Sequence, residues 1–193
     1  MDLYLYQGLA RYNIIESGRL LLRPFAMSDV DDMYVYASRP ENLTFVFPPH
    51  QSKDETAQAI VQQFMKAPLG HWAIELKADH RMIGSINFIK IDQKRMSAEI
   101  GYVLNMDYWG LGLVAEALKT LVVFSFEQFG LKTLIIKVDK ENQASKSVAL
   151  KAGFQFHKAY KATNQYTGQI RDFEEYQLRK RDYDETSRNT ELH

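Results

Sequence analysis

Cysteine is absent from all 193 residues, and this absence removes several kinds of chemistry at once. Disulfide bonds, thiolate nucleophiles and metal sites with cysteine ligands are excluded. The chain also has no stretch near the ~18 uninterrupted apolar residues of a membrane-spanning helix, and its N-terminus has no basic segment followed by an apolar core. We therefore expect no signal peptide and no membrane partner, and the cytoplasm fits best as the compartment.

An excess of positive charge is missing as well. Lys+Arg and Asp+Glu both number 24, so the formal net charge is zero. A protein that binds nucleic acid through bulk electrostatics carries a basic excess, so we expect no nucleic-acid partner. Hydrophobic residues make up 46% of the chain and charged residues 25%, which is typical of a globular protein. The length favours a single domain.

Short strands and helices follow one another along the chain. Ser28 precedes an acidic turn, and Ser52 is followed three residues later by Glu55, so serine is the expected N-cap of two helices. The Ile- and Leu-rich run at 132–140 is typical of a strand covered on both faces. The predicted strands are 19–24, 71–77, 81–92, 97–106, 132–140, 154–162 and 170–179, and the predicted helices are 28–39, 52–66, 112–129 and a short helix that ends at Gly153.

Two glycines, Gly110 and Gly112, stand just before the helix predicted at 112–129. A helix N-terminus presents unpaired N–H groups and a partial positive charge, and both stabilise a phosphate. Glycine lets the backbone approach such a phosphate closely. The segment 104–114 therefore has the layout of an anion cradle, although a tight turn without a ligand would need the same glycines. The loop lacks the Gly-Lys-Ser/Thr of a P-loop and the three-glycine dinucleotide fingerprint.

A second segment, DKENQASKSVALKAGF, leads from a strand end through Asn142 and Ser145 into a short helix closed by Gly153 and Phe154. Together the two segments resemble the Gcn5-related N-acetyltransferase (GNAT) superfamily. Its first motif, Q/R-x-x-G-x-G/A, holds the pyrophosphate of acetyl-CoA, and its second is N-x-x-S or N-x-x-Y. Here the Q/R position is Trp109 and the last G/A position is Val114, but neither change removes a backbone amide.

The chain is most similar to the RimJ/RimL-type subgroup, which includes N-terminal acetyltransferases of ribosomal proteins. The strings that carry this resemblance occur in the family's order over residues 14–180, and they are RLLLRPFAMSDVDDMY, HWAIELKADHRMIGSINF, AEIGYVLNMDYWGLGLVAEAL and VDKENQASKSVALKAGF. The resemblance implies one N-acetyltransferase domain at 14–180, with an N-terminal arm at 1–13 and a flexible C-terminal tail at 181–193. It implies an α+β fold with a mostly antiparallel sheet of six to seven strands, a splayed parallel pair near a bulge in its middle, and about four flanking helices.

The function implied by the resemblance is transfer of an acetyl group from acetyl-CoA to a primary amine by direct attack on the thioester, with no metal. Glu99 would be the general base acting through water, or else a strand residue bonded to its neighbours. Ser145 would donate to the departing thiolate, or cap a helix, and Asn142 would bind the cofactor's amide chain or act as a cap. The implied cofactor-binding set is Val103, Leu104, Trp109, Gly110, Leu111, Gly112, Leu113, Val114, Ala115, Asn142 and Ser145, and a backbone N–H of Val103 or Leu104 would bind the thioester carbonyl.

Several questions stay open at this level. The acceptor is a protein N-terminus, a polyamine, an antibiotic or another small amine, and the chain is a monomer or a homodimer. A non-catalytic acyl-CoA-binding or sensing domain and a generic phosphate-binding α/β domain are the alternative functions. The histidines are scattered singly and predict no metal site. Two sets of side chains have alternative roles: Lys146 and Lys151 face the 3′-phosphate of the cofactor or solvent, and Trp72, Tyr34, Tyr36 and Tyr160 line an acceptor pocket or belong to the core.

Overall fold

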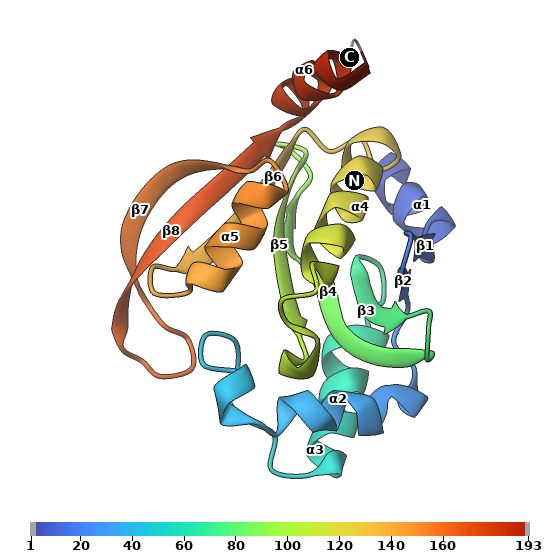
Figure 1. Cartoon of the computed structure of the whole chain (residues 1–193), viewed down its shortest axis with the longest axis vertical. Coiled ribbons are helices and arrows are strands. Elements are labelled where there is room, and N and C mark those ends of the chain that lie inside the picture. The colour runs from blue at the N-terminus through green and yellow to red at the C-terminus, as the bar shows by residue number, and fades with distance from the viewer. Residues whose placement is uncertain (1–2, 192–193) are drawn as a thin grey trace.

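The computed structural model describes residues 3–191 (Figure 1). One sheet runs through the molecule in the order β1-β2-β3-β4-β5-β6-β8-β7, and only the β5–β6 pair is parallel. Its strands are β1 (Ile15–Glu16), β2 (Leu20–Arg23), β3 (His71–Leu76), β4 (Arg81–Asp92), β5 (Ser97–Leu104), β6 (Thr133–Asp139), β7 (Gln155–Thr163) and β8 (Ile170–Arg179). The predicted mixed fold with a central parallel pair is confirmed.

Helices lie before, between and after the strands. They are α1 (Leu3–Arg11), α2 (Val30–Ala37), α3 (Lys53–Ala59), α4 (Leu113–Glu127), α5 (Gln143–Lys151) and α6 (Lys180–Glu191). Helix α3 continues as a π-helix over Ile60–Met65, which accounts for the longer helix predicted at 52–66. Short 3-10 turns at Met27–Asp29, Pro40–Asn42 and Met106–Tyr108 lead into or out of the longer elements.

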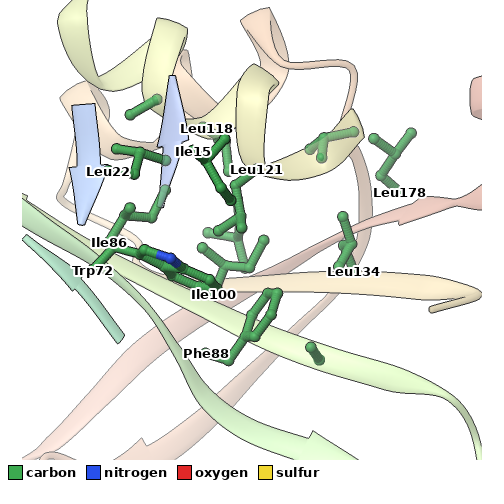
Figure 2. Close-up of a cluster of buried hydrophobic side chains, with 14 of the residues drawn as sticks. Ile15, Leu22, Trp72, Ile86, Phe88, Ile100, Leu118, Leu121, Leu134 and Leu178 are labelled. Atoms are coloured by element: carbon green, nitrogen blue, oxygen red, sulfur yellow. The ribbon is translucent and has the colours of Figure 1, made fainter. Parts of the chain in front are cut away.

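The main core lies on the face of the sheet covered by α1, α4 and α5. Successive strand residues point to opposite faces, so Trp72 of β3 faces this core whereas its neighbour Ala73 faces the other side. Figure 2 shows Trp72 lying against the sheet below Leu118 and Leu121 of α4. Trp72 is only 1% exposed, so it belongs to the core and not to an acceptor pocket.

A second, smaller core joins α2 and the π-helical turn to the opposite face of the sheet. Met33 and Tyr36 of α2 pack there with residues of β3, β4 and β5, and Tyr36 is fully buried. Within residues 3–191, this second core contains no residue of β6, β7 or β8. We call this side of the sheet the α2–α3 face. Its core covers β3, β4 and β5, and it does not extend over β6, β7 and β8 in the described chain.

Both ends of the described chain form helices, which the sequence analysis did not predict. Residues 3–11 form α1, and its Leu5 and Leu9, spaced four apart on one helical face, are fully buried in the main core. Residues 180–191 form α6, which extends from the end of β8 (Figure 1). The predicted arm and tail are thus helical where the structure describes them, and residues 1, 2, 192 and 193 lie outside the described part.

The two predicted N-caps have different outcomes. Ser52 caps α3 as predicted, because its Oγ accepts a hydrogen bond from the N–H of Glu55 at 3.1 Å. Ser28 lies inside the 3-10 turn and caps nothing. Its neighbour Asp29 is the buried residue instead, accepting from the N–H of Ala26 at 2.8 Å and pairing with Arg23 at 2.7 Å. Asp29, and not Ser28, therefore turns inward, because Asp29 pairs with Arg23.

Candidate active site

The two parallel strands β5 and β6 separate after a short paired segment. Their register covers only Ser97 to Glu99 on β5 and Thr133 to Ile135 on β6, although β5 continues to Leu104 and β6 to Asp139. The predicted splay is therefore present. Beyond these positions the two strands do not pair with each other within residues 3–191. Backbone N–H groups that face the gap can therefore bind an extended ligand.

Leu104, and not Val103, turns its backbone amide into the gap. The N–H of Asn105 donates to Ile83 O on β4 at 2.8 Å, and a Cβ built on Gly84 would collide with the carbonyl oxygen of Val103. Val103 therefore faces β4, and strand alternation turns Tyr102 and Leu104 toward the gap. Of the two predicted carbonyl-binding amides, this geometry favours that of Leu104.

The bulge in this region lies on β4. The β4–β5 register shifts between Phe88 and Lys90, opposite Ile100 and Glu99, whereas the sequence placed a bulge near Val103. No shift occurs at Val103 itself in the described sheet.

The end of β5 is fixed by side chains from two other segments. The carbonyl oxygen of Leu104 accepts from Asn42 Nδ2 at 3.0 Å and from Trp109 Nε1 at 3.0 Å. Asn42 Oδ1 also accepts from the N–H of Met106 at 2.6 Å, and Asn42 is only 4% exposed. Trp109 thus supports the site through its indole nitrogen, and Asn42 is a contributor that the sequence analysis missed.

The glycine loop, residues 105–112, ends at the N-terminus of α4 with unused hydrogen-bond donors. Gly110 and Gly112 adopt positive φ values of 78° and 74°. Within residues 3–191, the amides of 110 to 115 have no acceptor, and Glu116 N is the first to bond, to Gly112 O at 3.0 Å. These amides belong to Gly110, Leu111, Gly112, Leu113, Val114 and Ala115. The loop is therefore able to bind an anion with its backbone alone.

Glu116 ties this helix end to the turn between β1 and β2. Its carboxylate accepts from Ser17 Oγ at 2.6 Å, from Arg19 N at 2.8 Å and from Arg19 Nε at 2.6 Å. Burial raises the pKa of Glu116, but the hydrogen bonds from Ser17 and Arg19 and the charge of Arg19 outweigh it, so the pKa is lowered. Arg19 Nη1 in turn donates to Leu111 O at 2.9 Å. An open groove of about 650 Å³ beside these residues is also lined by Lys119 and Thr120.

Glu99 is the last residue of β5 that pairs with β6, and its side chain lies on the α2–α3 face of the sheet. Its Oε2 accepts from Lys137 Nζ of β6 at 2.7 Å, and its side chain is 17% exposed. Burial lowers the pKa of Lys137, but the hydrogen bond and charge of Glu99 outweigh it, so the pKa of Lys137 is raised. Lys137 was missed, although a lysine within the apolar run 132–140 was a visible irregularity.

The second motif places Asn142 and Ser145 at the start of α5, on the α4 side of the sheet. Asn142 is the N-cap, since its side chain accepts from the N–H of Ser145 at 3.0 Å. Ser145 Oγ lies 2.9 Å from the hydroxyl of Tyr102. The cap alternative therefore holds for Asn142, and Ser145 is not the cap. Tyr102 is another residue that the sequence analysis missed.

Two further predicted contributors have defined positions. Lys146 forms an ion pair with Glu174 of β8 at 3.0 Å, and both side chains are mostly buried, so Lys146 is not a solvated helix residue. Lys151 is exposed at the end of α5. Among residues 3–191, no cluster of His, Asp or Glu is placed to hold a metal ion, and no helix is long and apolar enough to cross a bilayer.

Comparisons with known proteins agree with this geometry. The sequence profile of the acetyltransferase (GNAT) domain matches residues 19–155. The uncharacterized N-acetyltransferase p20 of Bacillus licheniformis is 30% identical over 170 residues, which cover 86% of this chain and 95% of that protein. A ribosomal-protein-serine acetyltransferase of Escherichia coli (strain K12) is 30% identical over 105 residues, 54% of this chain and 59% of that protein.

Solved structures show the same fold. RimL, a ribosomal alpha-N-protein acetyltransferase in complex with coenzyme A, has a TM-score of 0.74 at 22% identity, covering 86% of this chain and 97% of that one. The profile match spans most of the strands and helices around the gap and the glycine loop. The chain therefore belongs to the acetyltransferase (GNAT) domain family, and it is an acetyltransferase.

Proposed function

We propose that this acetyltransferase takes its acetyl group from acetyl-CoA and transfers it to a primary amine by direct attack on the thioester. The observation that carries the proposal is the run of free amides from residue 110 to residue 115 at the N-terminus of α4. A pyrophosphate supplies the acceptors that these donors lack, and the helix dipole favours its charge. The left-handed backbone of Gly110 and Gly112 points the loop amides outward without a side chain in the way.

The gap between β5 and β6 suits the pantetheine arm and the thioester. Tyr102 and Leu104 present main-chain groups along this gap, and the Leu104 amide is the donor nearest the end of β5. A fixed N–H stabilises the carbonyl oxygen as it gains negative charge, because the donor does not have to reorganise during the reaction. Asn42 and Trp109 hold this end of β5 in place before any ligand arrives.

Glu99 and Ser145 lie on opposite faces of the sheet, and this placement suits a direct attack. Glu99 projects on the α2–α3 face, beside Lys137, and Ser145 lies in the first turn of α5 on the α4 side. An amine that approaches from the Glu99 face loses its proton to that carboxylate through water. A lysine-type amine has a pKa near 10.4 and an α-amine one of roughly 8, so the base is needed most for the former. The thiolate then departs toward Ser145.

The acceptor is proposed to be the amine of a protein N-terminus or of a small molecule. The Escherichia coli relative acts on a ribosomal protein, as its name states, and RimL is named for the same kind of acceptor. The α2–α3 face offers the amine an approach to Glu99, since no residue of β6, β7 or β8 belongs to the second core there, within residues 3–191. This face carries both signs of charge in Glu99, Lys137 and Glu175.

A thiol-release screen tests the proposal. Acetyl-CoA is offered with a panel of peptide N-termini and small amines, and at least one amine is expected to release free CoA thiol. Acetyl-CoA at 100 times its Kd is also expected to stabilise the fold by about 2.7 kcal/mol, because it binds the folded chain. Stabilisation by CoA with no thiol release from any amine would instead support a binding or sensing domain.

Glu99→Gln tests the base. We expect kcat to fall about 10²- to 10⁴-fold with a lysine-type amine, with the Kd of acetyl-CoA nearly unchanged. Glu41→Gln is the matched control, because Glu41 is exposed and its carboxylate has no partner in the described part of the chain. An unchanged rate with weaker cofactor binding in Glu99→Gln would remove Glu99 from the base role.

A further inference from the structure

Tyr102 of β5 contributes to the candidate site with its backbone, at the gap between β5 and β6, and with its side chain, at α5. Strand alternation turns its backbone toward the gap between β5 and β6. Its side chain reaches across to α5, where the hydroxyl lies 2.9 Å from Ser145 Oγ and 3.1 Å from Ser145 O. One residue therefore connects the strand that would bind the thioester with the hydroxyl proposed to receive the thiolate.

The protons of this hydroxyl pair have two arrangements. Tyr102 has one O–H proton, which is donated either to Ser145 Oγ or to Ser145 O. In the first arrangement the proton of Ser145 is free for a third group. In the second, Ser145 Oγ donates back to the tyrosine oxygen and has nothing left to give. Tyr102 is the only partner of Ser145 Oγ within residues 3–191.

We propose that Tyr102 is a positioning residue for acetyl transfer: by donating to Ser145 Oγ, it leaves the Ser145 proton free to be donated to the sulfur of the departing thiolate. This inference rests on the proposed function. As the C–S bond breaks, its electron pair stays on sulfur, and the hydrogen bonds run from Tyr102 to Ser145 and from Ser145 to sulfur. No proton is transferred along this chain; the amine proton leaves toward Glu99 and water.

Hydrogen bonding without proton transfer follows from the acidities. Burial raises the pKa of Tyr102 to about 12, and the hydrogen bond with Ser145 lowers it only in part. A thiol has a pKa of about 8.5, so a thiolate does not deprotonate this phenol. Consecutive hydrogen bonds polarise one another, and a donor bonded in this way is a stronger donor to an anion. Tyr102 therefore strengthens the donation by Ser145 while remaining neutral.

The thiol pKa of bound CoA tests the proposal directly. The absorbance of the thiolate is titrated with the full-length protein saturated with CoA, and desulfo-CoA provides the reference spectrum. In Tyr102→Phe we expect the thiol pKa to rise by about one unit, a tenfold loss of thiolate stabilisation, and kcat to fall about tenfold with the KM of acetyl-CoA little changed. Ser145→Ala is expected to shift the thiol pKa at least as far, and the double variant no further than Ser145→Ala.

Tyr176→Phe is the matched control. Tyr176 is also buried, with a pKa raised by burial to about 12, but its hydroxyl donates to Glu174 at 2.7 Å. A structural role alone would lower the melting temperature of both tyrosine variants and leave the thiol pKa unchanged. Should Tyr102→Phe fail to fold, Tyr102→Met removes the same hydroxyl with a flexible side chain that adapts to the space.

The outcomes separate this inference from the function on which it rests. A wild-type chain that binds CoA but releases no thiol refutes the transfer reaction and with it the role of Tyr102 in transfer; the thiol titration then shows only whether Tyr102 and Ser145 stabilise a bound thiolate. An unchanged thiol pKa in Tyr102→Phe, or effects of Tyr102→Phe and Ser145→Ala that simply add, overturns the inference while leaving the transfer reaction standing. Absence of CoA binding overturns both.

Discussion

Replacing Glu116 with glutamine perturbs the contact that holds the β1–β2 turn against the N-terminus of α4. The carboxylate accepts three hydrogen bonds, from Ser17 Oγ, Arg19 N and Arg19 Nε. The amide of glutamine keeps one acceptor oxygen and presents an NH₂ group where the second oxygen stood. We therefore expect both the fold and the glycine loop to respond, because Arg19 also bonds to Leu111 O.

The expected loss of stability is about 2 kcal/mol. The Arg19 side chain is 51% exposed, so its ion pair with Glu116 contributes only about 0–1 kcal/mol. The bonds from Ser17 and Arg19 N weaken by about 1 kcal/mol in total when the acceptor loses its charge. The negative charge of Glu116 in the first turn of α4 stabilises the fold by roughly a further 0.3–1 kcal/mol through the helix dipole. For a domain of this size the melting temperature should fall by about 4–8 °C.

The loss should depend on pH in one direction. The pKa of Glu116 is lowered in the folded chain, whereas in the unfolded chain it returns to about 4.3. The stabilisation by Glu116 is therefore complete above the unfolded pKa and disappears as the pH falls through the lower folded pKa. Wild type and Glu116→Gln should differ equally at pH 6 and pH 8, and the difference should shrink at pH values below about 4.3.

Urea unfolding of both proteins across this pH range measures the difference, with Glu41→Gln as the control for the same chemical change at an exposed carboxylate. The Kd of acetyl-CoA for Glu116→Gln should rise about threefold to tenfold, or about 0.7–1.4 kcal/mol, if the contact holds the loop for its ligand. A stability difference that persisted unchanged at the lowest pH would show that the charge of Glu116 does not matter. No difference at pH 7 would refute the contact itself.

Two further substitutions, Gly112→Ala and Asn42→Ala, test the site, and Gly168→Ala is the control for the first. Gly112→Ala should cost about 1–2 kcal/mol, because alanine resists the φ of 74°, although the nearest atom to its Cβ, Arg19 Nη2, is 3.8 Å away. Gly168→Ala, at φ 69° with open space around it, should cost a similar amount in urea unfolding and leave the Kd of acetyl-CoA unchanged, whereas Gly112→Ala should raise it. Asn42→Ala leaves Met106 N without its acceptor and should cost about 1–3 kcal/mol with a higher KM for acetyl-CoA, and an unchanged KM would contradict the role of Asn42 at the end of β5.

Local patterns predicted most of the fold because their causes are local. The Ser52 cap of α3 depends on an amide three residues away, and the alternation of Trp72 and Ala73 reflects the two faces of one strand. The short helix α1 was not predicted. Only two buried leucines, Leu5 and Leu9, mark it in the described chain, and nine residues are too few for their four-residue spacing to recur. The prediction of Ser28 as a cap was wrong. Asp29 turns inward instead because it bonds to Arg23, a residue outside the helix.

The candidate site was predictable in its backbone and much less so in its side chains. The glycine loop was placed by sequence, since two glycines so close together before a helix indicate positive φ angles whether or not a ligand binds there. The partners that define the side chains are far apart: Lys137 is 38 residues from Glu99, and Tyr102 is 43 residues from Ser145. One sequence contains no signal for such pairs, because each member is an ordinary strand or helix residue until the sheet brings them together.

Side chains from other segments bind the ends of both strands beside the gap between β5 and β6. At the end of β5, Asn42 and Trp109 take the carbonyl of Leu104, which would otherwise be free to bond toward β6. At the end of β6, Arg171 of β8 binds the carboxylate of Asp139 at 2.9 Å and 3.1 Å. Each strand end is thus bound by side chains from other segments in the folded chain. A ligand that enters the gap then binds donors already in place, and its affinity is not reduced by opening the sheet.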